Sequence, residues 1–157
     1  MHAFVSSKID YCNSLLYGLP KKHHDKLQRV LNCAARVISR LRKYDHITTV
    51  LATLHWLPIP QRIEFKILLL TFKALHGLAP LYLRELLVWH KAPRSLRSND
   101  LALLEVPKTR LKFYGDRTFA KAAPVLWNKL PLKIRLIDEL NVFKGSLKTH
   151  LYELAYM

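Results

Sequence analysis

The chain of 157 residues contains few glycines and few cysteines, and their scarcity excludes several kinds of site. Its four glycines are scattered, so neither a G-x-G-x-x-G run nor a Walker loop is present to hold a nucleotide phosphate. Its two cysteines, Cys12 and Cys33, lie 21 positions apart and form no C-x-x-C pair. We therefore predict neither a disulfide scaffold nor a zinc ribbon, and a reducing compartment fits best.

Acidic residues are also scarce, with 11 Asp and Glu against 26 Lys and Arg and a formal charge of +15. Only Asp138 and Glu139 are adjacent, whereas the other carboxylates stand alone in the sequence. A two-metal polymerase or nuclease site needs converging carboxylates around ions about 3.5–4 Å apart. Because no G-x-S-x-G motif is present either, we predict that the chain is not an enzyme and uses no metal or cofactor.

A long apolar run is missing as well. The most apolar stretch, residues 63–83, is interrupted by charged side chains and by Gly77 and Pro80. It cannot supply the ~20 apolar residues of a membrane span. The first ten residues lack the basic leader and apolar core of a secretory signal. We therefore expect an intracellular protein, nuclear or cytoplasmic, that is not secreted and does not cross a membrane.

The apolar half of the chain, 50% of its residues, is sufficient for a hydrophobic core. A folded chain of this length buries roughly 68–70% of its extended surface, so we expect residues 1–157 to form a single helical domain. The helix predicted over residues 60–76 is apolar on nearly every side, which is typical of a helix in the middle of a bundle. Helical spacing and end signals predict helices over residues 4–17, 24–41, 48–55, 60–76, 81–89 and 117–128, and a last helix that begins at Asn141.

Two details complete the predicted fold. Asp116 and Asn141 are expected to cap the last two helices, because Asp and Asn accept hydrogen bonds from free N–H groups. From Lys108 to Tyr114 basic and apolar residues alternate, a pattern typical of a strand. The fold class is therefore mainly α, a multi-helix bundle in which a short β-hairpin could form around residues 101–114. We expect Cys12 and the three tryptophans, Trp56, Trp89 and Trp127, to pack in the core.

The helix predicted over residues 24–41 has two different faces. One arc, about 120° wide at 100° per residue, is apolar, and the opposite arc is basic. The apolar arc consists of Leu27, Val30, Leu31, Ala34, Val37, Ile38 and Leu41, and the basic arc of Lys26, Arg29, Arg36, Arg40 and Lys43. Residues 21–43 carry a net charge of +7, with Asp25 as their single acid, and residues 91–121 carry +5.

Regularly spaced cations on one helix face can follow the phosphates of a nucleic acid. We therefore predict that RNA, DNA or an RNA–DNA hybrid is the partner. The second basic stretch contributes Lys108, Arg110, Lys112, Tyr114 and Arg117, of which Tyr114 could stack on a base. The alternative hypothesis is a solvated surface that only keeps the protein soluble. A third hypothesis, with less support in the sequence, is that the basic residues bind an anionic membrane surface.

Other reactive side chains give little signal. Cys12, His23, His24 and Cys33 have the sulfur and imidazole groups that zinc prefers, but their spacing matches no known pattern of ligand pairs. The cations around Cys33 could lower the pKa of a thiol, but no orienting His or Asp accompanies it. We predict neither a zinc site nor a nucleophilic cysteine.

Several motifs occur along the chain in the order found in one known family. They are FVSSKIDYCNSLLYGLP at residues 4–20, LQRV at 27–30, AAR at 34–36, HWLP at 55–58, RI at 62–63, FKILLLTFKALHG at 65–77, GDR at 115–117 and AAPVLWNKLP at 122–131. Over nearly its whole length the chain thus resembles the C-terminal region of LINE-type (non-LTR) retrotransposon reverse transcriptases of the chicken-repeat and jockey-like groups.

The resemblance implies the part of an RNA-directed DNA polymerase that follows the palm, as thumb and C-terminal extension. The Tyr/Phe-Ala-Asp-Asp motif of the palm is not in this chain, so no catalytic residue can be transferred. In such a region a helical bundle would grip template and primer, and the missing palm domain would be a further partner. We expect a non-catalytic nucleic-acid-binding fragment of such an enzyme. The alternative is an orphaned structural fragment that packs against the absent polymerase domain and has no activity of its own.

Overall fold

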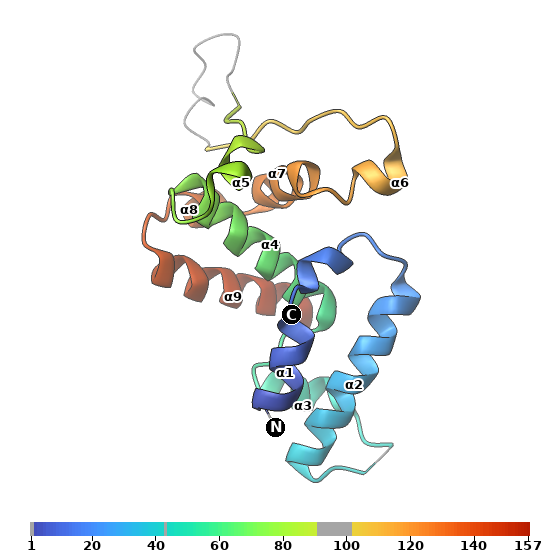
Figure 1. The fold of residues 1–157 in the computed structure, drawn as a ribbon. Helices are drawn as coiled ribbons and strands as arrows, with labels where there is room; N and C mark the ends of the chain where they lie inside the picture. Colours follow the sequence, from blue (N-terminus) through green and yellow to red (C-terminus); the bar gives the residue numbers. More distant parts are fainter. Residues whose placement is uncertain (1, 43, 91–101) are drawn as a thin grey trace. The chain divides into compact units, whose positions relative to one another are not determined.

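The computed structural model describes residues 2–42, 44–90 and 102–157, and this part of the chain is helical and contains no strand. The prediction of a mainly α, multi-helix fold is confirmed (Figure 1). In order along the chain the elements are α1 (His2–Asp10), the 3₁₀ helix η1 (Asn13–Leu16), α2 (Lys21–Ser39), α3 (Ile47–Thr53), α4 (Ile59–Leu75), α5 (Leu81–Glu85), α6 (Lys112–Gly115), α7 (Phe119–Lys129), α8 (Leu132–Arg135) and α9 (Leu140–Tyr156).

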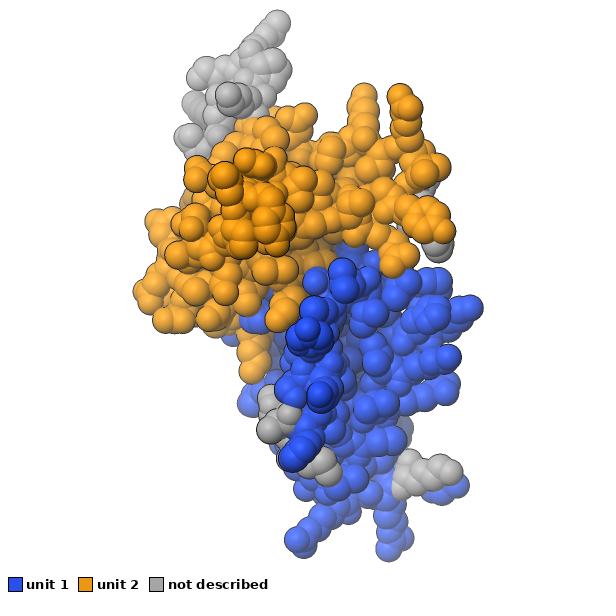
Figure 2. All heavy atoms as spheres, in the orientation of Figure 1, with its two compact units in different colours: residues 1–65, 149–157 blue, residues 66–148 orange. Residues whose placement is uncertain are grey.

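These helices form two compact units, which Figure 2 shows in different colours. Unit 1 consists of residues 1–65 and 149–157, and unit 2 consists of residues 66–148. Helices α4 and α9 therefore contribute residues to both units. Along α4 the side chains of Ile63, Ile67, Leu68 and Phe72 are almost completely buried. This agrees with the expectation that an apolar helix lies in the middle of helical packing.

Unit 1 packs α1, α2 and α3 together with the start of α4 and the end of α9. Its apolar core includes Ile9, Leu31, Leu51, Trp56 and Leu151. Because each of these helices contributes an apolar stripe, no one of them buries its stripe without the others.

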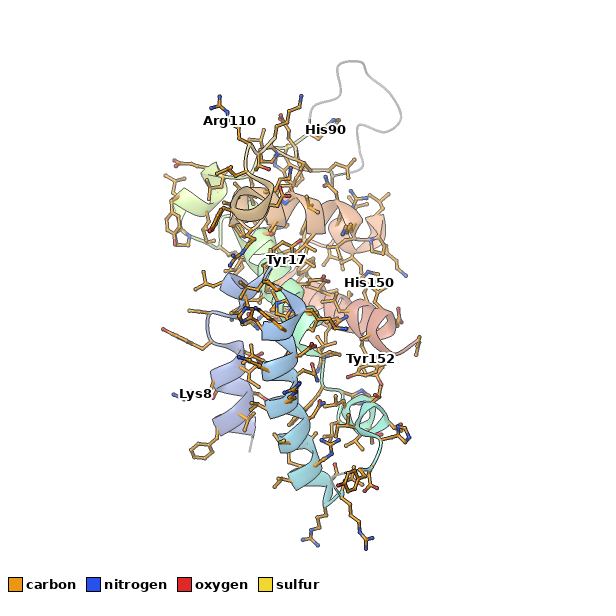
Figure 3. All side chains as sticks on the ribbon, turned by 90° about the vertical axis from the view of Figure 1, so that its right-hand side faces the viewer. Lys8, Tyr17, His90, Arg110, His150 and Tyr152 are labelled. Carbon is orange, nitrogen blue, oxygen red and sulfur yellow. The ribbon has the colours of Figure 1, made fainter. Side chains whose placement is uncertain are left out.

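Two tyrosines of α9 fix the end of this helix in unit 1. The hydroxyl of Tyr152 donates to the carbonyl of Ala52 at 3.1 Å, and Tyr152 lies beside α3 (Figure 3). The hydroxyl of Tyr156 donates to the carbonyl of Trp56. Burial raises the pKa of Tyr156 to about 12, so the phenol keeps its proton, and remains a donor, to a higher pH than an ordinary tyrosine does.

Unit 2 is centred on stacked aromatic rings. The ring centroids of Phe72 and Phe143 are 4.2 Å apart, and those of Trp127 and Phe143 are 5.9 Å apart. All three side chains are completely buried. The indole N–H of Trp127 donates to the carbonyl of Ala102 at 2.9 Å. The predicted core positions of Trp56 and Trp127 are therefore confirmed, because both are buried.

The helix predicted over residues 4–17 is interrupted. α1 ends at Asp10, Cys12 takes a left-handed conformation with φ 50°, and a single 3₁₀ turn follows. The side chains of Asp10 and Asn13 both contact Arg62 of α4, and these tertiary contacts prevail over the local helical preference. As a result Cys12 is exposed, and its predicted place in the core was wrong.

The hairpin predicted around residues 101–114 is not formed in the described part of that segment. Residues Lys112–Gly115 are helical, as the bond from the amide of Gly115 to the carbonyl of Leu111 at 2.7 Å shows. The single β-bridge found among the described residues joins Leu104 to Trp89 instead. The loop before α6 is held by Lys121, whose ammonium donates to the carbonyl of Pro107 at 2.9 Å. The alternating segment, residues 108–114, finds no partner strand among the described residues.

Other differences lie at helix ends. α5 ends at Glu85, because the chain then extends to pair with Leu104, and Trp89 is exposed rather than packed in the core. α7 begins after Thr118, and the carboxylate of Asp116 accepts a hydrogen bond from Thr109 at 2.8 Å instead of capping a helix. α9 begins at Leu140, so Asn141 lies inside it and is not its cap.

The close approach of Gly115 to Thr109 yields a first prediction. A Cβ atom added at Gly115 would lie 2.7 Å from the Cβ of Thr109, whose hydroxyl is held by Asp116. We expect Gly115→Ala to lower the free energy of unfolding by about 1–3 kcal/mol. Around Gly145 in α9, no atom beyond its chain neighbours and the adjacent backbone of its own helix lies within 4 Å of an added Cβ. Gly145→Ala should therefore raise the free energy of unfolding by about 0.5–1 kcal/mol. Urea unfolding measures both changes; equal effects would contradict this account.

Candidate nucleic-acid interface

The candidate interface is the outward face of α2, and its position depends on how α2 is fixed in unit 1. Leu31, Ala34 and Ala35 are buried on the opposite side of the helix. The side-chain oxygen of Gln28 accepts a hydrogen bond from the amide of Ile59 at 2.9 Å. Ile59 is the first residue of α4, so Gln28 satisfies an N–H that the helix itself leaves without a partner. α2 is thereby joined to the start of α4.

A row of side chains runs along the outer side of α2 at alternating spacings of four and three, which places them on one line of the helix surface. The row consists of Lys22, Lys26, Arg29, Cys33 and Arg36, and we call it the basic row. Lys22, Lys26, Arg29 and Cys33 are exposed, whereas Arg36 is half-buried. With a rise of 1.5 Å per residue, the row is about 21 Å long.

In the described part of the chain, the cations of the basic row form no close ion pair with a carboxylate. Within residues 2–42, 44–90 and 102–157, no Asp or Glu oxygen lies within 4.0 Å of Lys22, Lys26, Arg29 or Arg36. The one acidic residue of α2 is Asp25. Unpaired cations in a row produce a positive potential along the helix, which attracts a polyanion.

The basic row differs from the predicted basic arc at both ends. It includes Lys22, which was not predicted, and it does not include Arg40 or Lys43, which were. Because α2 begins at Lys21 rather than at residue 24, Lys22 joins the same line four residues before Lys26. Arg40 follows the helix in a left-handed conformation with φ 52°, so it is exposed but does not continue the helical row. Lys43, also predicted there, lies outside the described residues. The early start is signalled by Pro20, which precedes the helix as its cap residue.

The apolar side of α2 is narrower than the sequence indicated. Val30, Val37 and Ile38 were expected to pack, but all three are exposed. Ala35, which lies outside the predicted apolar arc, is completely buried. The packing face is thus turned toward Ala35, and α2 contacts both α1 and α3. Val30 and Val37 remain as exposed apolar side chains beside the basic row.

The second predicted basic group belongs to unit 2 and does not share one helix face. Lys108 and Arg110 are exposed and precede α6, Tyr114 is exposed within α6, and Arg117 is half-buried after it. Lys112 lies in α6, and its side chain is outside the described residues. The basic row is therefore the more regular of the two groups.

Two searches of the described residues concern metal ligands and membrane-spanning helices. No group of three or more His, Cys, Asp and Glu side chains in the described segments could hold a metal ion. One ring nitrogen of His24 is already engaged with the carbonyl of Leu16 at 2.9 Å, and Cys12 and Cys33 are free thiols. None of the helices described is long and apolar enough to span a bilayer.

Known proteins provide no further identification. Neither the protein-family models, nor the curated proteins, nor the solved structures contain a match to this chain.

The anchoring of α2 by Gln28 yields a second prediction. Gln28→Leu removes the acceptor for the amide of Ile59, so we expect the free energy of unfolding to fall by about 0.5–2 kcal/mol. Gln61 is a matched control, because its side-chain oxygen is buried and has no hydrogen-bond partner among the described residues. Gln61→Leu should therefore leave stability unchanged or raise it. Chemical denaturation of both variants provides the measurement, and an equal loss in the two would refute the anchoring role of Gln28.

Proposed function

We propose that the chain is a non-catalytic nucleic-acid-binding module whose basic row on α2 contacts the phosphates of RNA, DNA or an RNA–DNA hybrid. The observation that carries this proposal is the line of Lys22, Lys26, Arg29 and Arg36, which has no carboxylate partner among the described residues. A surface that only served solubility would not need to gather its cations in a single line. Nor would it leave that line almost without acids.

The length of the basic row fits several phosphates of a duplex. A duplex carries about one phosphate charge per 1.7 Å of its axis, so about 12 phosphates occupy a length of ~21 Å. Only those on the side that faces α2 are within reach of its four cations. Such contacts neutralise the backbone and do not read the bases. Binding should therefore tolerate changes of nucleic-acid sequence.

The first turn of α2 strengthens the attraction for an anion. Lys21 and Lys22 lie in this turn, and it contains no acidic residue. The N-terminus of a helix already carries a partial positive charge from its aligned peptide dipoles. Two lysines there raise the positive potential further, which is unfavourable for the free protein. A phosphate close to this end would relieve the repulsion.

The resemblance in the sequence supports a more specific origin for this module. Residues 27–30 and 34–36, two of the segments similar to non-LTR reverse transcriptases, both lie within α2. We infer that the chain corresponds to the post-palm region of such an RNA-directed DNA polymerase, where it would grip template and primer. The palm domain of a parent polymerase would then be a second partner.

A structural fragment without activity of its own is the second candidate function. It is favoured by the large apolar side chains that α1 and the following turn expose, namely Phe4, Tyr11 and Leu15. A missing polymerase domain could cover them. In that case the basic row would be a solvated surface, and nucleic acid would not bind to the isolated chain.

The proposed contact with phosphates predicts a steep dependence on salt. For an RNA–DNA hybrid we expect roughly five to eight phosphate contacts, made by the four cations of the basic row together with other exposed cations such as Lys21 and Arg40. The logarithm of the affinity should then fall with the logarithm of the salt concentration, with a slope of magnitude about 4–7. Replacing Lys22, Lys26 and Arg29 by Ala should reduce this magnitude by about 2–3 and weaken binding about 10-fold or more near 0.1 M salt. Fluorescence anisotropy with a labelled hybrid measures both quantities.

The matched control removes the same charge from another place. Lys129, Lys133 and Lys148 are exposed and lie on α7, α8 and α9. Their triple replacement by Ala should change the slope by less than the α2 variant does. Equal effects of the two triple variants would show that only net charge matters. A slope near zero, or no binding at low salt, would reject the proposal.

The two candidate functions also predict different unfolding behaviour. An independently folded module should lose its helical circular dichroism in a cooperative thermal transition. A fragment that needs its missing domain should melt gradually and bind a hydrophobic dye before heating. We expect the cooperative transition. A gradual melt with dye binding would favour the structural fragment instead.

A further inference from the structure

The outer face of α1 exposes two aromatic rings with a cation between them. Phe4 and Tyr11 are each 80% exposed, and Lys8 is exposed as well. Residues spaced by four and by three lie on one line of a helix surface, and Tyr11 directly follows the last residue of α1. We call Phe4, Lys8 and Tyr11 the aromatic line. In Figure 3 the side chain of Lys8 points away from the protein.

The contacts on the inner face of α1 hold the aromatic line in place. Ile9 is buried on that face, and both carboxylate oxygens of Asp10 accept hydrogen bonds from Arg62 of α4. The side chain of Asn13 donates to the carbonyl of Arg62 at 3.5 Å. Tyr11 lies between Asp10 and Asn13 in the sequence. Because both of these neighbours are held against α4, the ring of Tyr11 is left in the solvent.

The charges around the aromatic line favour an anionic partner. Asp10 is the one acidic residue of α1, and its carboxylate is already paired with Arg62. α1 contacts α2, which carries the basic row, and both helices belong to unit 1. The two rings therefore lie beside one cation and on the helix next to a row of others. Proteins that bind a single strand combine cations along its backbone with aromatic side chains on which its bases stack.

We propose that the aromatic line binds a single strand of RNA or DNA, whose bases stack on Phe4 and Tyr11 while Lys8 contacts a phosphate between them. This inference rests on the proposed function, because the basic row would hold the duplex from which the strand continues. Phe4 and Tyr11 are separated by about 10.5 Å along the helix axis. About three stacked nucleotides cover this distance at ~3.4 Å each. The line therefore fits a short single-stranded overhang.

Stacking and phosphate contacts respond differently to salt. A phosphate contact releases counterions, so the binding of the basic row weakens as salt is added. A base that stacks on a ring displaces no counterion. Removal of the two rings should therefore lower the affinity for a single strand and leave the slope of the salt dependence unchanged. Removal of cations from the basic row should change that slope.

Fluorescence anisotropy with two RNA–DNA hybrids of equal duplex length tests the inference. One hybrid is blunt, and the other carries a single-stranded overhang of about six nucleotides, within the range that one binding site covers. The wild type should bind the overhang hybrid more tightly. Replacing Phe4 and Tyr11 together by Leu removes the rings but keeps the side chains apolar. This variant should lose about 5-fold or more of its affinity for the overhang hybrid, and none for the blunt one.

Two further variants make the result specific to the rings. Phe4→Tyr combined with Tyr11→Phe keeps both rings and should bind the two hybrids like the wild type. Tyr82→Leu is the matched control, because Tyr82 is a tyrosine of unit 2 that is 64% exposed. It should also bind like the wild type.

Several outcomes would overturn the inference. They are equal wild-type affinities for the two hybrids, an equal loss for both hybrids in the leucine variant, or a loss as large in Tyr82→Leu. Undiminished binding of the overhang by the leucine variant would overturn it as well, and would leave the rings to another occupant such as the absent polymerase domain. Failure of the wild type to bind the blunt hybrid would instead reject the proposed function, because the blunt hybrid tests the basic row alone.

Discussion

The ion pair between Arg62 and Asp10 is the contact on which unit 1 depends. One guanidinium nitrogen of Arg62 lies 2.8 and 3.0 Å from the two carboxylate oxygens of Asp10, and another donates to the carbonyl of Leu57 at 2.8 Å. The Arg62 side chain is only 11% exposed, so its charge must be paired where it lies. This requirement fixes the end of α1, the turn before α4 and the first turns of α4 together.

The position of the basic row follows from this arrangement. α4 begins at Ile59, whose amide is bound by Gln28 of α2, and α2 buries Leu31 and Ala35 on the same side. With that side fixed, Lys26 and Arg29 face outward, where the described part of the protein offers them no carboxylate. The surroundings of Arg62 and of the basic row differ in their access to water, and this difference decides where each cation finds an anion. The buried guanidinium of Arg62 is paired with Asp10, and the exposed cations of the basic row remain available for an external polyanion.

The sequence predicted the elements whose signal is local and missed those that depend on distant contacts. The apolar pattern was sufficient for α2, α4 and the last helix, and it indicated the basic side of α2. It could not show that α1 stops where Asp10 meets Arg62, or that Trp89 leaves the core to pair with Leu104. Lys22 was missed because the helix start was placed too late, and Val30 was misplaced because packing against α1 and α3 selects the buried side.

The central claim is that nucleic acid covers the basic row, and the two free cysteines test it within one molecule. Cys33 stands in the basic row and Cys12 in the turn after α1, and both are exposed. The rate of maleimide alkylation at each thiol can be followed by mass spectrometry with and without an RNA–DNA hybrid. The account predicts that the hybrid slows alkylation of Cys33 while Cys12 reacts as before. Equal rates at Cys33 with and without a saturating hybrid, or protection of Cys12 alone, would contradict it.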